Sequence, residues 1–79
     1  MVTLYTTVWC GFCKMAKHYM DEQGVKYVEK DVEQDPSAAT EAVQKSGQMG
    51  VPVIDVNGTI IVGFDKPQLD RAFTDNNLT

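Results

Sequence analysis

An Asn57-Gly58 dipeptide lies between two short apolar runs and constrains the fold of this chain more than any other feature. The flanking residues 53–56 and 59–62 are rich in Val and Ile, which favour β-strands. A tight two-residue hairpin turn needs positive φ at both positions, which Asn and Gly tolerate best. The sequence therefore predicts an antiparallel hairpin over residues 53–62.

The first third of the chain predicts a strand, a helix and a second strand. Residues 2–6 are apolar and β-rich, and residues 25–28 form another such run that tails off toward Val32. Between them, apolar side chains recur at helical spacing from about residue 13 to residue 23, and Gly24 is a suitable residue to follow the helix. This succession of a β-rich run, a helical segment and a second β-rich run is typical of a strand–helix–strand unit.

Two further helices are predicted from their starting signals. Asp35-Pro36 combines an N-cap residue with a proline at the first helical position, and Gly47 ends this helix. Asp65, followed three residues later by Gln68, predicts the cap of a last helix. The apolar positions that the helical spacing assigns to buried stripes are Ala16, Tyr19, Met20, Ala39, Ala42, Val43, Leu69, Ala72 and Phe73.

The predicted order of elements is therefore β-α-β-α-β-β-α. Strands joined by a helix should be parallel with a right-handed crossover, whereas the hairpin adds two antiparallel strands. The expected fold class is α/β, with a four-stranded mixed sheet and three helices distributed over both faces. At 79 residues, the chain has room for one domain, which we expect to span residues 1–79.

Charge and hydropathy exclude several classes of partner. Lys and Arg total 7 against 11 Asp and Glu, so the net charge is −4. We expect no nucleic-acid partner, because binding a phosphate backbone needs a basic surface. No apolar run approaches the roughly 18 residues of a membrane helix, and Met1 is followed by no basic segment typical of a signal peptide. We therefore expect a cytoplasmic protein without a membrane partner.

Cys10 and Cys13 are the only cysteines and form a Cys-x-x-Cys motif. As a structural bridge, so short a loop would contribute only about 2 kcal/mol. A structural zinc site wants four ligands, but there is no second Cys-x-x-Cys, and His18 is the single histidine. Redox chemistry is the remaining interpretation, and it is favoured here because a predicted strand precedes the pair and a predicted helix follows it.

The position of the pair at the start of a helix predicts different roles for the two thiols. Disulfide exchange needs a thiolate, and a free thiol with a pKa of ~8.5 is mostly protonated at pH 7. Cys10 should receive the unpaired N–H groups and the partial positive charge of the helix N-terminus, so we expect it to be the nucleophile. Cys13 lies one turn further on and deeper, and should resolve the mixed disulfide.

Three motifs carry a family resemblance: Trp9-Cys10-Gly11-Phe12-Cys13, Gly50-Val51-Pro52 and Val62-Gly63-Phe64-Asp65. With these motifs, the sequence resembles the thioredoxin superfamily over essentially the whole chain, and its length resembles that of glutaredoxins. This resemblance implies a thioredoxin-like fold in its minimal glutaredoxin form and a dithiol–disulfide oxidoreductase that acts on disulfide-containing proteins or glutathione mixed disulfides.

Residues around the pair are candidates for substrate contact. Phe12 and Trp9 could each pack against the fold, but we expect both to lie beside the site and touch the substrate. Lys14 could add positive potential near Cys10, and the same holds for Lys17, for which a solvated helix position is at least as plausible. His18 is expected on the surface and too far along the helix to act as a base.

The resemblance assigns further residues to substrate binding. In the family, the proline at the position of Pro52 is cis and leaves the backbone of the preceding residue, here Val51, free to pair with an extended substrate. Gln48 lies where glutaredoxins often carry a polar residue that contacts glutathione.

The segment before the last helix departs from the family pattern. By resemblance, Gly63, Phe64 and Asp65 would hold the γ-glutamyl end of glutathione. Only one of the two aspartates of the family remains, because Lys66 occupies the other place. Weak glutathione binding is therefore expected, with glutathione a possible co-substrate and no bound cofactor or metal.

Two alternatives stay open at this point. The Gly63-Phe64 pair resembles glutaredoxin-shaped redoxins that serve ribonucleotide reductase and take electrons from thioredoxin reductase. The Cys-Gly-Phe core also resembles glutaredoxins that carry an iron–sulfur cluster. The electron source is therefore expected to be either glutathione or thioredoxin reductase, and the chain is expected to be a monomer that functions in electron transport and redox homeostasis.

Overall fold

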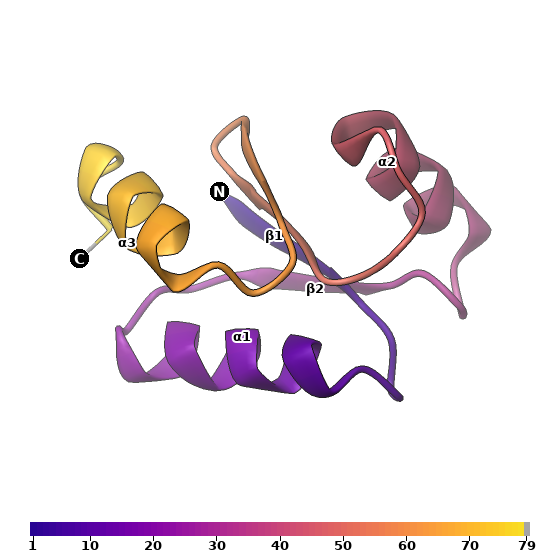
Figure 1. Cartoon of the computed structure of the whole chain (residues 1–79), viewed down its shortest axis with the longest axis horizontal. Helices are drawn as coiled ribbons and strands as arrows, with labels where there is room; N and C mark the ends of the chain where they lie inside the picture. Colours follow the sequence, from indigo (N-terminus) through magenta and orange to yellow (C-terminus); the bar gives the residue numbers. More distant parts are fainter. Residues whose placement is uncertain (79) are drawn as a thin grey trace.

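Four strands and three helices follow one another in the predicted order in a computed structural model, which describes residues 1–78 (Figure 1). The strands are β1 (Val2–Thr6), β2 (Val28–Asp31), β3 (Val53–Val56) and β4 (Thr59–Val62). The helices are α1 (Gly11–Glu22), α2 (Pro36–Ser46) and α3 (Lys66–Asp75). None of the helices in this described part has the length and apolar character that crossing a membrane requires.

The strands form one mixed sheet in the order β2-β1-β3-β4. Strand β1 pairs in parallel with β2 and antiparallel with β3, which pairs antiparallel with β4. The Asn57-Gly58 turn of the β3–β4 hairpin has φ values of 51° and 100°, as the sequence predicts. Asp55 closes this turn by accepting a hydrogen bond of 2.7 Å from the Gly58 N–H.

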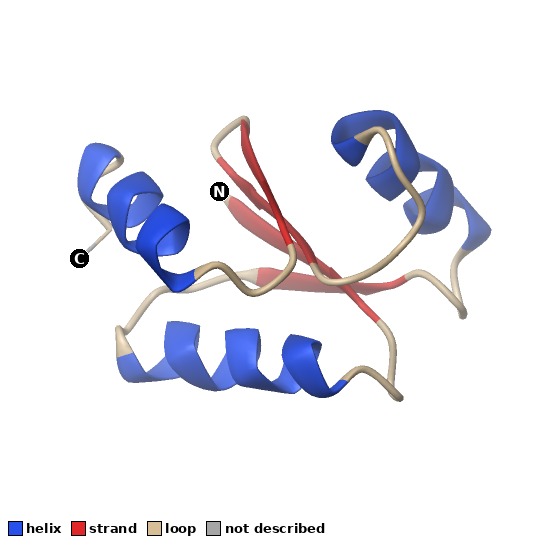
Figure 2. Cartoon of the chain, viewed as in Figure 1, coloured by secondary structure: helices blue, strands red, loops and turns tan. Residues whose placement is uncertain are grey.

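Helices cover both faces of the sheet, so the predicted layering is confirmed (Figure 2). Helices α1 and α3 pack on one face, where the larger core lies, and α2 packs on the other face. The buried residues of the larger core are Val2, Leu4, Ala16, Met20, Val25, Ile54, Val56, Ile61, Leu69, Ala72 and Phe73. The smaller core beneath α2 consists of Tyr5, Ala38, Ala42 and Val53.

Two predicted boundaries are wrong, both next to α1. The helix begins at Gly11, two residues before the expected start, because Cys10 serves as its N-cap. Strand β2 begins at Val28 rather than at Val25. The N–H groups of Gly24 and Val25 bond to the carbonyls of Asp21 and Met20, which forms a Schellman motif. Val25 therefore closes the helix instead of opening the strand.

The predicted buried stripe of α2 is also partly wrong. Ala42 is buried as expected, but its buried partner is Ala38, four residues earlier on the same helical face. Ala39 is half-buried, and Val43 is exposed. Residues 38 and 42 therefore mark the face of α2 that turns toward the sheet.

Polar contacts complete the attachment of α2. The fully buried Tyr5 donates its hydroxyl to Glu41 over 2.8 Å and accepts a hydrogen bond of 2.9 Å from Lys45. Lys45 also pairs with Asp55 at 2.7 Å, and these two hydrogen bonds raise the pKa of Lys45. Hydrogen bonds from Tyr5 and Lys30 lower the pKa of Glu41. Hydrogen bonds and ion pairs therefore add to the small apolar core in attaching α2.

Candidate active site

Three loops meet at one end of the sheet because of its register. Tyr5 near the end of β1 pairs with Val53 at the start of β3, which pairs with Val62 at the end of β4. The segments 7–10, 50–52 and 63–65 continue from these paired residues. All three sequence motifs therefore lie at the same end of the sheet, although up to about fifty residues separate them along the chain.

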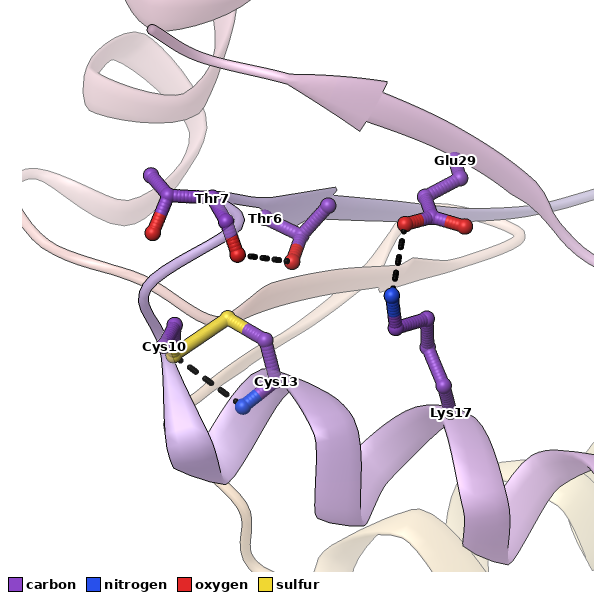
Figure 3. The surroundings of a disulfide bond; sticks show 6 residues. All are labelled: Thr6, Thr7, Cys10, Cys13, Lys17 and Glu29. Carbon is purple, nitrogen blue, oxygen red and sulfur yellow. Dashed lines mark hydrogen bonds and ion pairs between the residues drawn. A yellow bond between two sulfur atoms is a disulfide. The ribbon is translucent and has the colours of Figure 1, made fainter.

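Cys10 and Cys13 form a disulfide at the start of α1, with their Cα atoms 5.2 Å apart (Figure 3). Cys10 is the N-cap of the helix, and the N–H of Cys13 donates a hydrogen bond of 3.0 Å to the Cys10 Sγ. The first turn of α1, all of which the structure describes, contains no acidic residue. Once the disulfide is reduced, these features would stabilise a thiolate at Cys10.

The two sulfurs differ in their access to solvent. Cys13 is 0% exposed and faces the sheet, whereas Cys10 is partly exposed at the surface. The buried Thr6 lies close to the pair in the view of Figure 3, where its hydroxyl donates to the carbonyl of Thr7 over 3.3 Å. A disulfide-bearing substrate can therefore approach Cys10 but not Cys13.

The loop before β3 carries the second motif. The Val51–Pro52 peptide bond is cis, which confirms that expectation. Pro52 is buried, and its carbonyl accepts a hydrogen bond of 2.8 Å from the N–H of Gly63. Val51 is half-buried and lines an apolar cavity of about 240 Å³ with Thr7 and residues of α2. The hydrogen bond between Pro52 and Gly63 joins the second motif directly to the third.

Gly63 has a φ of 79°, which a side chain would strain. The next residues lead into α3: Asp65 caps the helix by accepting from the Gln68 N–H at 3.2 Å, as predicted. Phe64 is half-buried and packs edge-on against Tyr19, with ring centroids 6.1 Å apart. The Phe64 ring therefore packs against the fold and is not fully exposed to a substrate.

Lys66 has a partner that the sequence did not indicate. Its Nζ lies over the Tyr19 ring, 5.0 Å from the centroid, and the Tyr19 hydroxyl donates to Asp70. At an exposed position such a cation–π contact is weak. Lys66 is thus an exposed positive charge at the start of α3, next to Asp65 in the chain.

The remaining predicted side chains are on the surface. Trp9 is 84% exposed and Phe12 is 63% exposed, so neither packs into the core. Lys14 and Gln48 are exposed as well. Lys17 points from α1 toward Glu29 on β2 and pairs with it at 2.9 Å, which explains its orientation better than a role at the site (Figure 3).

His18 lies on the surface, as expected, where it contacts Glu22 at 3.1 Å. Two exposed methionines, in contrast, were not predicted from the sequence. Met15 and Met49 are exposed although Met is usually a core residue, and neither was singled out from the sequence. The i, i+3 spacing of Phe12 and Met15 could have indicated that they share a helix face.

Within residues 1–78, no group of three or more His, Cys, Asp or Glu side chains is arranged to hold a metal ion. Cys10 and Cys13 form a disulfide in which Cys10 is partly exposed and Cys13 is buried. This geometry favours exchange between dithiol and disulfide.

Comparisons with known proteins support the same chemistry. A family model described as Glutaredoxin matches residues 2–61. A glutaredoxin-like 8.6 kDa protein encoded in the rubredoxin operon of Clostridium pasteurianum is 38% identical over 71 residues, which are 90% of this chain and 95% of that protein. The glutaredoxin of Pseudomonas aeruginosa is 35% identical over 72 residues, 90% of this chain and 86% of the relative.

A solved structure with a similar fold is that of the glutaredoxin-like NrdH-redoxin from Escherichia coli, whose activity profile is described as thioredoxin-like. The two chains superpose with a TM-score of 0.78 and are 27% identical. The match covers 89% of this chain and 91% of the redoxin.

Proposed function

This chain belongs to the glutaredoxin family, has the thioredoxin-like fold and is a thiol–disulfide oxidoreductase, and we propose that it reduces protein disulfides by a two-step exchange at Cys10 and Cys13. The observation that carries the proposal is the contrast between an accessible Cys10 at a helix N-terminus and a fully buried Cys13.

In the first step, the Cys10 thiolate attacks one sulfur of a substrate disulfide. A new S–S bond forms between Cys10 and that sulfur, and the other substrate sulfur leaves as a thiolate that takes a proton from water. The Cys13 N–H, which points at the Cys10 Sγ, stabilises the attacking thiolate.

In the second step, Cys13 loses its proton and attacks the Cys10 sulfur. The substrate leaves as its second thiolate, and the Cys10–Cys13 disulfide remains, so two electrons have passed to the substrate. The short separation of the pair, 5.2 Å between Cα atoms, lets this step proceed without movement of the helix.

Recognition of the substrate would use the three loops at this end of the sheet. We assign the exposed rings of Trp9 and Phe12 to contact with the substrate around its sulfur, and the backbone of Val51 to pairing with an extended segment. Gln48 and Lys14 supply polar contacts from the rim. Gly63, Phe64 and Asp65 would form the edge of the site beyond the cis-proline loop.

For the electron source, we favour a flavin-dependent thioredoxin reductase over glutathione. Lys66 follows Asp65 at the edge where the family takes the ammonium of glutathione, and its positive charge would repel that group. The likeness to a redoxin with a thioredoxin-like activity profile supports the same choice. We further propose a monomer that works in the reducing cytoplasm without a bound cofactor.

Trapping of the intermediate tests the proposed exchange. The Cys13→Ser variant should accumulate a mixed disulfide between Cys10 and a protein substrate, which mass spectrometry would detect as an added mass that dithiothreitol removes. Cys10→Ser is the matched control and should form no adduct. Adduct formation by Cys10→Ser, or its absence from Cys13→Ser, would reverse or exclude the assigned roles.

A paired assay tests the electron source. Reduction of a protein disulfide is followed by NADPH consumption, once with thioredoxin reductase and once with glutathione and glutathione reductase. Faster turnover with thioredoxin reductase is expected. Equal or faster turnover with glutathione would remove the proposed preference and leave the exchange mechanism intact.

A further inference from the structure

The loop between α2 and β3 carries Val51 into the site and is fixed at both of its ends. At its far end, the carbonyl of Pro52 accepts a hydrogen bond of 2.8 Å from the segment before α3. At its near end, Gly47 ends α2 with a φ of 75°, and its N–H donates to the carbonyl of Val43 over 2.8 Å. A single hydroxyl, that of Ser46, extends this attachment into the loop.

The Ser46 hydroxyl contacts both backbone groups of Gln48. Its oxygen accepts a hydrogen bond of 3.3 Å from the Gln48 N–H and lies 2.9 Å from the Gln48 carbonyl. The carbonyl of Ala42, one turn back in α2, lies 2.7 Å away. The hydroxyl has one proton, so it donates to one of these carbonyls while a lone pair accepts from the N–H. Ser46 thereby joins the last turn of α2 to the loop.

A second hydroxyl of the same helix shows what is special about Ser46. Hydroxyls in helices often bond back to the carbonyl four residues earlier, so the contact of Ser46 with Ala42 needs no functional explanation by itself. Thr40 makes the same contact, 3.2 Å to the carbonyl of Pro36, and this hydrogen bond stays within α2. The bonds to Gln48 therefore distinguish Ser46 from Thr40.

Beyond Gln48, three loop residues lack backbone partners in the part of the chain that the structure describes. The N–H and C=O groups of Met49, Gly50 and Val51 form no hydrogen bond there. Gly50 has a φ of 139°, which few residues other than glycine adopt. These free groups are suited to pair with an extended substrate, but a segment with such freedom loses entropy when it does so.

We propose that Ser46 is a positioning residue for substrate binding: its hydroxyl limits the free part of the loop to residues 49–51 and holds Val51 where it pairs with an extended substrate. This inference rests on the proposed pairing of Val51 with the substrate and adds the side chain that prepares the loop for it. Without the hydroxyl, Gln48 joins the free segment, so more backbone must be ordered when a peptide binds. The cost falls on binding and not on the sulfur chemistry at Cys10.

Two short peptides and one small probe test this role. Each peptide carries one cysteine as a mixed disulfide with thionitrobenzoate, and in the second peptide the amide nitrogens on both sides of the cysteine are methylated. Attack of the Cys10 thiolate on the peptide sulfur releases thionitrobenzoate, whose absorbance gives the rate, and Cys13 then displaces the peptide thiol. The mixed disulfide of mercaptoethanol and thionitrobenzoate is the minimal probe, since it has no backbone to pair.

In Ser46→Ala, the concentration of unmodified peptide that gives half the limiting rate should rise about three- to tenfold, which corresponds to the loss of one hydrogen bond. The limiting rate should change by less than about twofold, because only binding is affected. The methylated peptide should bind the wild type weakly and lose little further in Ser46→Ala, because both changes affect the same pairing.

Two variants provide matched controls. Ser46→Thr keeps a hydroxyl at this position and should behave like the wild type. Thr40→Ala removes a helical hydroxyl from α2 without touching the loop, so it should leave the half-saturating peptide concentration unchanged.

NMR relaxation provides a readout that does not depend on activity. The order parameters of the Met49 and Val51 N–H groups should fall in Ser46→Ala and stay unchanged in Thr40→Ala. Unchanged order parameters in Ser46→Ala would contradict the proposed fixing of the loop.

The kinetic outcomes separate the role of Ser46 from the exchange mechanism. An unchanged half-saturating concentration in Ser46→Ala would overturn the role of Ser46 and leave the mechanism intact. The same would follow if both peptides weakened equally, or if Thr40→Ala had the same effect, since the change would then not come from pairing with the loop. Failure of the minimal probe to react with the wild type would contradict the exchange mechanism itself.

Discussion

Two cysteines with a sequence separation of 3 lie in opposite environments, and this contrast explains the division of labour between them. Cys10 ends an extended segment and caps α1, so its sulfur lies where the helix presents N–H groups to the surface. Cys13 is inside the first turn and points to the sheet, where it is buried. The same strand–turn–helix geometry thus provides one reactive sulfur and one protected sulfur.

Alkylation of single-cysteine variants tests this contrast. Cys10 in the reduced Cys13→Ser variant should react with iodoacetamide at least about tenfold faster at pH 7 than Cys13 in Cys10→Ser, because its thiolate is stabilised and exposed. The rate measured against pH gives the thiolate fraction of each. A faster reaction at Cys13 would contradict the assigned roles.

Lys66 allows a second test at the level of single residues. Changing Lys66→Asp restores an acid next to Asp65 and removes the ammonium that contacts the Tyr19 ring. The expected result is a lower KM for a glutathionylated peptide, by roughly three- to tenfold, because one charged contact changes from repulsive to attractive. Lys26→Asp is the control, and an unchanged KM in Lys66→Asp would mean that this position does not govern glutathione recognition.

Among the three helices, α2 buries the fewest and smallest side chains and bonds to the sheet through polar groups. Its buried residues are Ala38 and Ala42, which are small, whereas Glu41 and Lys45 both bond to the hydroxyl of Tyr5. The hydrogen bond from Tyr5 and the ion pair with Lys30 lower the pKa of Glu41. This attachment should therefore weaken in acid.

A Tyr5→Phe variant tests the polar attachment. The carboxylate of Glu41 has a lowered pKa in the folded state, so its contribution is complete above the unfolded value of about 4.3 and is lost as the pH falls through the folded value. The free energy of unfolding should drop by about 1 kcal/mol at pH 7 and by less at pH 3. Urea unfolding at both values measures the difference.

The Glu41→Gln background provides the control for this experiment. Without the titrating carboxylate, Tyr5→Phe should cost the same at pH 7 and pH 3. A pH-dependent cost that persists in this background would assign the effect to another group, such as Asp55. Burial alone would raise the pKa of Asp55, but its hydrogen bonds from Lys45 and the Gly58 N–H lower it overall.

The elements were predictable from the sequence where the governing signal is local. The Asn57-Gly58 turn and the caps at Asp35 and Asp65 are set by a few adjacent residues, and all three were correct. The start of β2 was wrong because Val25 has the composition of a strand residue but completes the end of α1. A pattern of apolar residues cannot distinguish these two uses.

At the site, too, local features could be predicted from the sequence, whereas long-range contacts could not. The positions of Cys10 and Cys13 and the exposure of Phe12 follow from the strand–turn–helix context and from the family resemblance. The contacts of Lys66 with Tyr19 and of Tyr5 with Glu41 and Lys45 join segments far apart in the chain. Such contacts depend on the packed arrangement of the elements and leave no spacing signal.

At the scale of the whole molecule, the two faces of the sheet are unequally filled. The face beneath α1 and α3 holds large buried side chains such as Leu4, Met20 and Phe73, whereas the face beneath α2 has the small core around Tyr5. The disulfide lies at the start of α1 and therefore belongs to the face with the larger core. The redox pair and α2 thus rest on different layers of the molecule.

This asymmetry predicts that α1 and α2 differ in local stability. Opening of α2 exposes little apolar surface, so its amide protons should exchange with deuterium at lower opening free energies than those of α1 and β1. Native-state exchange followed by NMR would give that order, and equal protection in α1 and α2 would contradict it. Because α2 leads into the loop that carries Val51 and Pro52, such an opening would loosen one wall of the site while the Cys10–Cys13 pair keeps its support.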